Sequence, residues 1–228
     1  MSAAVPGWLA PLADAAASIG GDDLSRFLPP DDGSGRPSAV LISFADGPDG
    51  PSVLLIERSS DLRKHAGQVA FPGGSIDDGD ASPVAAALRE ATEEVGLDAA
   101  DVQVIAALPP IFIPVTGFVV TPVLAWCPAL HDPAAVRAVS AAEVARVELV
   151  PIAELTDPSH RFLVNGPAGY LSPGFEARGL FVWGFTAGLL DRLLDIAGWA
   201  QPWDRTVRRP LPPLPGYPSP PTAAVDRD

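Results

Sequence analysis

Runs of apolar residues separated by turn-forming residues predict strands in the first half of this chain. Residues 38–44 (SAVLISF) and 52–57 (SVLLIE) are rich in Val, Leu and Ile, and they enclose the turn-forming segment 45–50. This arrangement is typical of a β-hairpin. Two further strands are expected at residues 102–107 and 119–126. Pro122 lies within the last of these, which indicates an edge strand or a bulge because proline cannot donate a ladder hydrogen bond.

Helical composition is found in four segments, residues 13–19, 83–95, 141–147 and 183–197. The second is the best defined, because Ser82 suits the N-cap, Pro83 the first helical position and Gly96 the position after the end. The segment also carries an apolar stripe, formed by Val84, Leu88, Ala91 and Val95. Strands and helices do not alternate regularly, so we expect an α+β fold or a layered α/β/α sandwich rather than a doubly wound sheet.

The density of proline, glycine and charged residues divides the chain into three parts. Residues 1–35 are expected to form an N-terminal extension that ends in a linker, and residues 36–200 a single globular domain. Residues 201–228 contain eight prolines and are expected to be extended or disordered. The tail could instead be a ligand for an SH3-like groove, and both interpretations are kept.

Composition excludes several classes of protein. The formal net charge of −13 argues against a nucleic-acid partner, which would require a basic surface. The single cysteine, Cys127, excludes a disulfide framework and a zinc site built from cysteines. The longest apolar stretch, residues 180–190, is too short to cross a bilayer, and the first residues lack the basic segment of a secretory signal. We therefore expect a cytoplasmic protein with no membrane partner.

Three glutamates of the predicted helix at residues 83–95 are the first candidates for chemistry. Glu90, Glu93 and Glu94 fall within an arc of about 100° on the face opposite the apolar stripe. Carboxylates four residues apart repel each other, and a divalent cation would remove the repulsion. Backbone N–H groups of the preceding Gly73-Gly74 loop would lie near the same place. The residues alone leave two interpretations open, a solvated helix face and a metal–pyrophosphate site.

The spacing of these residues resembles the Nudix box, G-x5-E-x7-R-E-U-x-E-E-x-G-U, in which U is aliphatic. Gly74 and Asp80 are followed by residues 89–97, REATEEVGL. Two departures are visible, since Asp80 replaces the first glutamate and one extra residue precedes Arg89. The resemblance implies a Nudix-type α/β/α sandwich with a mixed β-sheet, and hydrolysis of a nucleoside diphosphate linked to another group.

A second resemblance lies upstream of the helix. Residues 54–59 (LLIERS), Arg63, Gly67 and residues 71–74 (FPGG) are similar to the signature of the coenzyme A pyrophosphatase branch, L-L-T-x-R-[SA]-x3-R-x3-G-x3-F-P-G-G. Ile56 replaces the threonine, and the resemblance covers about residues 37–197. It implies hydrolysis of coenzyme A, or of a derivative, to 3′,5′-ADP and 4′-phosphopantetheine. Whether free, acylated or oxidised coenzyme A is preferred stays open.

The resemblance also implies roles for individual residues. Glu90, Glu93 and Glu94 would bind Mg²⁺ or Mn²⁺, with Glu93 and Glu94 counted among the catalytic residues. Arg89 would orient a glutamate, and Asp80 would have a structural role or act as a ligand. Gly73 and Gly74 would let the backbone turn sharply beside the substrate.

Residues outside the box complete the predicted site. Arg58, Arg63 and Lys64 form a basic patch with His65, which would bind the phosphates of an anionic substrate, or would be an ordinary basic turn. His65 is expected to donate a hydrogen bond. Glu143, in the predicted helix at residues 141–147, is the candidate general base, and Glu148 is the alternative.

Two other functions are compatible with the sequence. One is a Nudix hydrolase that acts on ADP-ribose, NADH or a dinucleoside polyphosphate. The other is a Nudix-fold module that senses a nucleotide without cleaving it, although such a module would be expected to lack box glutamates that this chain retains. In either case the partner is a small molecule, and a homodimer is common among relatives.

Overall fold

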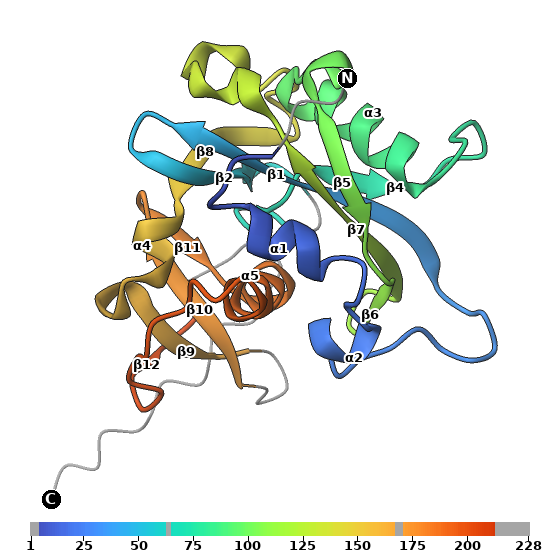
Figure 1. Ribbon diagram of the computed structural model, residues 1–228. Coiled ribbons are helices and arrows are strands. Elements are labelled where there is room, and N and C mark those ends of the chain that lie inside the picture. Colours follow the sequence, from blue (N-terminus) through green and yellow to red (C-terminus); the bar gives the residue numbers. More distant parts are fainter. Residues whose placement is uncertain (1–4, 63–64, 167–170, 213–228) are drawn as a thin grey trace, which may run out of the picture.

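The computed structural model describes residues 5–62, 65–166 and 171–212, which form two β-sheets with helices packed around them (Figure 1). The larger sheet contains eight strands, β1 (Arg36–Gly47), β2 (Gly50–Arg58), β3 (Val69–Ala70), β4 (Gly73–Ser75), β5 (Gln103–Ala107), β6 (Ile111–Ile113), β7 (Phe118–Trp126) and β8 (Val144–Pro151). Its main order is β3-β2-β1-β7-β5, while β8 pairs with β2, β4 with β1, and β6 with β7. The sheet is mixed, because β1 and β7 are parallel and the other pairs are antiparallel.

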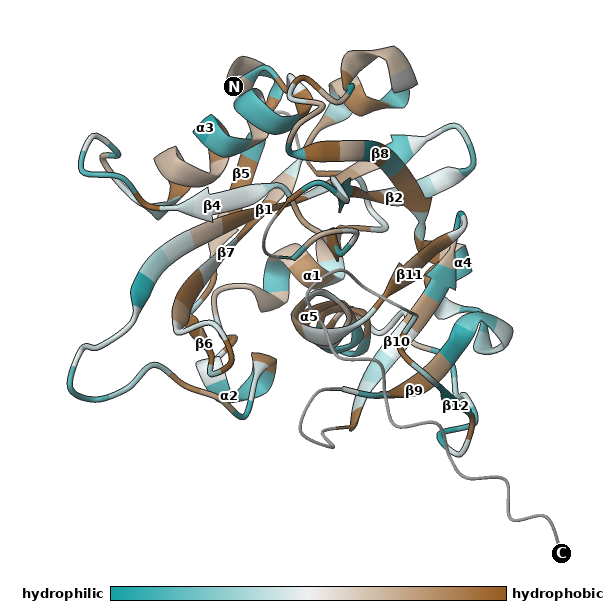
Figure 2. Ribbon diagram, turned by 180° about the vertical axis from the view of Figure 1, so that it is seen from behind, coloured by the Kyte–Doolittle hydropathy of each residue, from teal (hydrophilic) through white to brown (hydrophobic). Residues whose placement is uncertain are grey.

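The predicted hairpin and the predicted fold class are confirmed. β1 and β2 pair antiparallel, with Gly47 opposite Gly50 at the turn. The middle of β2 is apolar on both faces, and Leu54, Leu55 and Ile56 are all fully buried. Figure 2 shows the apolar residues concentrated along the central strands of this sheet. A strand buried on both faces reads as a continuous apolar run, which is why its sequence signal was strong.

The smaller sheet was not expected. It contains β9 (Arg161–Asn165), β10 (Leu171–Ala177), β11 (Leu180–Val182) and β12 (Arg208–Arg209), in the order β11-β10-β9-β12. Pro173 and Gly174 lie inside β10, and both residue types are depleted in strands. β12 lies in the proline-rich tail and pairs with β9 in parallel, so residues 208–209 are extended. The rest of the tail, from residue 213, lies outside the described residues.

Five α-helices are described, α1 (Ala10–Ala15), α2 (Gly21–Leu24), α3 (Pro83–Val95), α4 (Ile152–Thr156) and α5 (Gly184–Ile196). Four single 3₁₀ turns complete the elements of the described residues, η1 (Ala99–Asp101), η2 (Pro128–His131), η3 (Pro133–Ala135) and η4 (Pro158–His160). α3 packs against β1, β4 and β7, whereas α5 packs against β10, α1 and α2 (Figure 1). No helix of the described residues is long and apolar enough to cross a membrane.

The predicted boundaries of α3 are confirmed. The Ser82 hydroxyl accepts a hydrogen bond from the Ala85 N–H at 3.2 Å, and Gly96 ends the helix with φ of 71°. The buried face is rotated from the predicted stripe. Ala91 and Val95 are fully buried, but Val84 and Leu88 are only partly buried. The face turned toward the sheet therefore includes a glutamate, Glu94, which is described below.

One predicted element is wrong. The helix expected at residues 141–147 is not formed, because residues 141–143 form a turn and β8 begins at Val144, where backbone pairing with β2 overrides the local helical composition. Of the two possibilities for Pro122, the edge strand is wrong, since β7 lies between β1 on one side and β5 and β6 on the other. The bulge is found: between the pairs Ala107–Val123 and Ile111–Val120, residues 108–110 lie opposite only residues 121–122. Pro122 lies at this bulge. Its missing N–H falls in the break between β5 and β6, where its carbonyl accepts from the Leu108 N–H at 2.8 Å.

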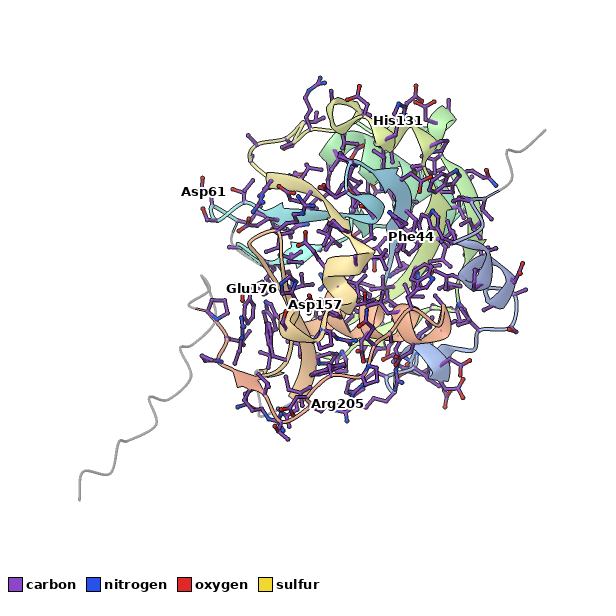
Figure 3. The ribbon with its side chains drawn as sticks, turned by 60° about the vertical axis from the view of Figure 1, so that its left-hand side comes forward. Phe44, Asp61, His131, Asp157, Glu176 and Arg205 are labelled. Carbon is purple, nitrogen blue, oxygen red and sulfur yellow. The ribbon has the colours of Figure 1, made fainter. Side chains whose placement is uncertain are left out.

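The N-terminal segment packs into the main hydrophobic core. Helix α1 begins three residues before the predicted helix and ends at Ala15, and Leu9 and Leu12 are fully buried. Trp8 makes edge contacts with Phe44, an interior side chain labelled in Figure 3, at a ring-centroid distance of 6.3 Å. The N-terminal segment therefore contacts the large sheet through Trp8, while α1 and α2 pack against α5.

Candidate active site

A cleft of about 500 Å³ opens where α3, the loop around Gly73 and the start of α5 meet. Three carboxylates line it, those of Glu90, Glu94 and Glu143. The opposite wall is largely apolar and includes Ile113, Val115, Phe118, Trp183 and Phe185. A cleft with a few polar groups converging on one side is the usual form of a small-molecule site.

Glu94 is the most unusual residue of this cleft, because its carboxylate is buried. Its side chain is 3% exposed, and Oε2 accepts a hydrogen bond from the Gly73 N–H at 3.0 Å. Arg58 Nη1 lies 3.5 Å from Oε1. Burial raises the pKa of Glu94 to about 7; the Gly73 hydrogen bond and Arg58 oppose this increase, whereas Glu90 and Glu143 add to it. Glu94 therefore does not lie on a solvated face of the helix.

Glu90 lies one turn before Glu94 and lines the same cleft. Burial raises the pKa of its half-buried carboxyl, and the adjacent Arg89 acts in the opposite direction. Gly74 makes room for this carboxylate, because a Cβ at position 74 would lie 2.4 Å from Glu90 Oε1. Gly73 has φ of 157° and would place a Cβ 2.4 Å from the Ala39 carbonyl oxygen. Each glycine therefore permits a close approach that no other residue would allow without movement.

Arg89 joins the loop before α3 to the glutamates of the helix. It forms two parallel hydrogen bonds to Asp80, at 3.1 and 3.0 Å, and its Nη1 donates to Glu90 at 3.0 Å and to Glu93 at 3.2 Å. The hydrogen bonds from Arg89 also lower the pKa of Asp80. Arg89 does not line the cleft, so its position is that of a residue that orients Glu90. The Glu93 side chain is 57% exposed and does not line the cleft either.

Glu143 lies in the turn before β8, not on a helix. Its carbonyl accepts a hydrogen bond from the Ser59 N–H at 2.8 Å, which anchors the turn to the end of β2. Its carboxylate lines the cleft and is close enough to Glu94 to affect the pKa of that residue. Glu148 forms an ion pair with Arg146 at 2.7 Å and is not part of the cleft lining. Of the two candidate bases, only Glu143 faces the cleft.

The predicted basic patch is described in part. Arg58 lines the cleft, and its buried Nε has no hydrogen-bond partner within the described residues. His65 also lines the cleft, and its Nδ1 lies 2.9 Å from Gln68 Oε1. Arg63 and Lys64 lie outside the described residues. Arg58 is thus a cationic donor available to an anion in the cleft.

The apolar wall is formed by segments that lie outside the Nudix box. The turn between β6 and β7, with the residues that flank it, contributes Ile113, Val115, Thr116 and Phe118. The start of α5 contributes Trp183, Gly184, Phe185 and Thr186. The sequence predicts a helix at residues 183–197, but not that its first residues and the turn before β7 line the same cleft as Glu94. Their positions depend on the pairing of β6 with β7 and on the packing of α5, which are contacts between distant segments.

The donor set fits a divalent cation that shares its ligands with a substrate. No group of three His, Cys, Asp or Glu side chains converges on one point within the residues that the structure describes. Mg²⁺ commonly takes only one or two protein carboxylates, together with substrate phosphate oxygens and water. Glu90 and Glu94 provide two such carboxylates on one side of an open cleft, and a cation there would offset the cost of the buried charge.

The family of the chain is established by comparison with known proteins. The model of the NUDIX domain matches residues 35–168. NudL of Escherichia coli K12, described as an uncharacterized Nudix hydrolase, is 42% identical over 171 residues that cover 69% of this chain and 81% of NudL. The protein of the same name in Shigella boydii serotype 4 gives the same values.

The fold is also shared with a solved structure. The crystal structure of RenU, a Nudix hydrolase from M. smegmatis, has a TM-score of 0.50 and 22% sequence identity, covering 75% of this chain and 90% of RenU. At that identity the likeness concerns the fold alone. The domain match, which spans more than half of the chain, and the 42% identity to NudL together show that this chain belongs to the Nudix family.

Proposed function

We propose that this protein is a metal-dependent pyrophosphohydrolase that cleaves coenzyme A, or a derivative of it, to 3′,5′-ADP and 4′-phosphopantetheine. The observation that carries the proposal is the pair Glu90 and Glu94, held in one cleft beside the Gly73-Gly74 loop in a chain of the Nudix family. The family match supports hydrolysis of a nucleoside diphosphate derivative. The choice of coenzyme A rests on the branch signature at residues 54–74.

Each residue has a role that its position favours. Glu90 and Glu94 would hold Mg²⁺ or Mn²⁺, and Glu93, which pairs with Arg89, would contribute as a third ligand only after its side chain turned toward the cleft. A cation bound there would neutralise charge on the pyrophosphate oxygens and acidify a water molecule. Arg58 would bind a phosphate oxygen, because its guanidinium faces the cleft and retains an unused donor.

Proton transfer and orientation fall to two further residues. Glu143 would accept the proton of the attacking water, since it is the candidate base that lines the cleft. Arg89 would fix the rotamer of Glu90 through its hydrogen bonds to Asp80 and Glu90. Arg63 and Lys64 would extend the basic patch that a strongly anionic substrate needs on a protein of net charge −13.

Product analysis tests the proposal. Purified protein is incubated with Mg²⁺ or Mn²⁺ and, in parallel, with coenzyme A, 3′-dephospho-coenzyme A, ADP-ribose and NADH. We expect 3′,5′-ADP and phosphopantetheine from coenzyme A, no reaction with a chelator present, and a loss of at least about 100-fold in Glu94→Gln. Glu148→Gln, which changes a glutamate outside the cleft, is the control and is expected to retain activity.

Each alternative outcome has a definite meaning. Turnover of ADP-ribose or NADH without turnover of coenzyme A would refute the substrate and retain the Nudix hydrolase activity. Metal-dependent binding of nucleotides without turnover of any would support the sensing module. Loss of activity in Glu148→Gln but not in Glu143→Gln would reverse the assignment of the base. We also propose that the enzyme is cytoplasmic and acts on a small-molecule substrate. Analytical ultracentrifugation would test whether it forms the expected homodimer.

A further inference from the structure

A second chamber adjoins the candidate active site. Its volume is about 640 Å³, and it shares with the first cleft the wall residues Ile113, Val115, Trp183, Gly184 and Phe185. It extends between α2 and the turn after β6 on one side and α5 and β10 on the other. The two cavities therefore lie side by side along this shared wall.

The chamber is apolar along most of its length. Its apolar side chains are Leu24, Phe27, Ile111, Phe112, Ile113, Pro114, Val115, Pro173, Trp183, Phe185 and Leu189. Ser172 also lines it; this residue is only 6% exposed, and its hydroxyl has no hydrogen-bond partner within the described residues. A buried hydroxyl without a partner is costly, and a ligand with amide groups would satisfy it. Gly188 also lines the chamber, and a Cβ there would meet no atom within 4 Å.

Three arginines line the chamber, Arg26, Arg192 and Arg205, and Arg192 lies at the end farther from Gly184 along α5. Within the described part of the chain one carboxylate lines the chamber, that of Asp191, and it is paired with the buried Arg161. Arg192 and Arg205 form no ion pair with the described residues. Figure 3 shows Arg205 at the lower edge of the molecule. On a protein of net charge −13, this local excess of positive charge favours an anionic group at that end.

Length decides which part of the proposed substrate reaches the arginines. Arg192 lies eight residues beyond Gly184 on α5, which is about 12 Å along the helix axis. The pantetheine arm spans twelve bonds from its phosphate oxygen to sulfur, or about 13–14 Å when extended, and a four-carbon acyl group with a terminal carboxylate adds about 4–5 Å. Because Gly184 lies in the shared wall and not at the glutamates, the acyl end of the arm, rather than its sulfur, is expected beside Arg192. The ribose 3′-phosphate lies only about six bonds from the pyrophosphate, or roughly 7 Å, and is too short.

We propose that this chamber binds the pantetheine arm, and that Arg192 and Arg205 select coenzyme A thioesters whose acyl group ends in a carboxylate. The inference rests on the proposed function, and it deepens that function by naming the class of substrate. The apolar walls accommodate the methylene and dimethyl groups of the arm, and Ser172 donates to one of its amide carbonyls. The arginines then meet the acyl carboxylate at the far end.

The first experiment blocks the chamber. Gly188→Leu places a side chain in the open space at position 188, and Gly188→Ala is the matched control, since alanine is well tolerated within a helix. Inhibition by the two products is measured in each variant. We expect Gly188→Leu to weaken binding of 4′-phosphopantetheine at least tenfold and to leave 3′,5′-ADP, which lacks the arm, unchanged. Melting temperatures check that both variants are folded.

The second experiment tests the choice of acyl group. We compare kcat/KM for succinyl-coenzyme A and butyryl-coenzyme A, which have four acyl carbons and differ in the terminal carboxylate. Wild type is expected to prefer the succinyl thioester about fivefold, as one partly exposed ion pair allows. In Arg192→Gln combined with Arg205→Gln this ratio should fall to about one, with butyryl-coenzyme A unchanged.

Three results would overturn the inference. If Gly188→Leu weakened the binding of both products equally, or of neither product, the arm would not enter the chamber. A succinyl preference that is absent in wild type, or that survives in the double variant, would show that the arginines do not select the acyl group. If wild type hydrolysed no coenzyme A compound, the proposed function would fail, and this inference with it.

Discussion

Replacing the buried carboxylate of Glu94 should stabilise the metal-free protein at high pH while it abolishes activity. Glu94→Gln keeps the shape of the side chain and an oxygen that can accept the Gly73 hydrogen bond. It removes a charge that has been taken out of water, with only Arg58 at 3.5 Å as a partner. Enzyme sites commonly gain stability when a strained or buried functional group is removed.

The sign and the magnitude follow from the pKa. The pKa of Glu94 rises from an ordinary value of 4.5 to about 7, so between these values the folded protein binds a proton that the unfolded chain has released. The free energy of unfolding therefore falls as the pH rises from 4.5 to 7, and it has lost up to about 3 kcal/mol above pH 7. In the Glu94→Gln variant the free energy of unfolding does not fall in this way, because glutamine does not ionise. Because the raised pKa already includes the opposing effect of Arg58, the variant should be about 3 kcal/mol more stable at pH 8.

Thermal and urea unfolding at pH 5 and pH 8 with a chelator present would measure this difference. For a chain of this size, about 3 kcal/mol corresponds to a rise in Tm of roughly 6–12 °C at pH 8, with a much smaller difference at pH 5. Glu93→Gln is the matched control on the same helix, because that side chain is 57% exposed, and its Tm should change by less than about 2 °C. A Glu94→Gln variant that is less stable than wild type at pH 8 would refute the reasoning.

Three further predictions concern the loop, the arginine and the N-terminal segment. Gly74→Ala should lower kcat at least tenfold with little change in Tm, because the added Cβ displaces the Glu90 carboxylate. Gly73→Ala should lower Tm, because its added Cβ meets backbone atoms. Equal effects of the two variants on Tm would contradict this prediction. Arg89→Lys should lower kcat about 10- to 100-fold with the metal-free Tm nearly unchanged, and an unchanged kcat would show that the forked hydrogen bonds are not needed. Leu12→Ala should lower the free energy of unfolding by about 3 kcal/mol in urea, and a change below about 1 kcal/mol would indicate a detachable N-terminal extension.

Elements that carry their own local signals were predictable from the sequence. Helix α3 has a capping serine, a proline at its first position and a terminal glycine, and each of these acts within one turn of the chain. The predicted and observed boundaries agree for that reason. β8 has no such signals, and it is a strand because β2 lies beside it. The smaller sheet was missed for the same reason, since β12 pairs with a strand more than 40 residues earlier.

In the candidate site, too, local signals were predictable and contacts between distant segments were not. Helical periodicity places Glu90, Glu93 and Glu94 on one broad face, but it cannot say where the sheet and the Gly73 loop meet that face. The structure turns Glu90 and Glu94 toward the cleft and leaves Glu93 with Arg89 at its edge. Glu143 comes close to Glu94 only because β8 pairs with β2, so the candidate base was named on a helix that does not exist.

The position of Glu94 links the stability of this protein to its proposed chemistry. Position 73 requires a glycine, because other residue types rarely adopt the backbone conformation that brings its N–H to 3.0 Å from the Glu94 carboxylate. That hydrogen bond partly offsets the cost of burying the carboxylate. A stronger partner than Arg58 would make the metal-free protein more stable, but it would also compete with a cation for the same oxygens. The incomplete pairing of Glu94 is therefore what leaves the carboxylate available, and metal binding should restore the stability that ionisation removes.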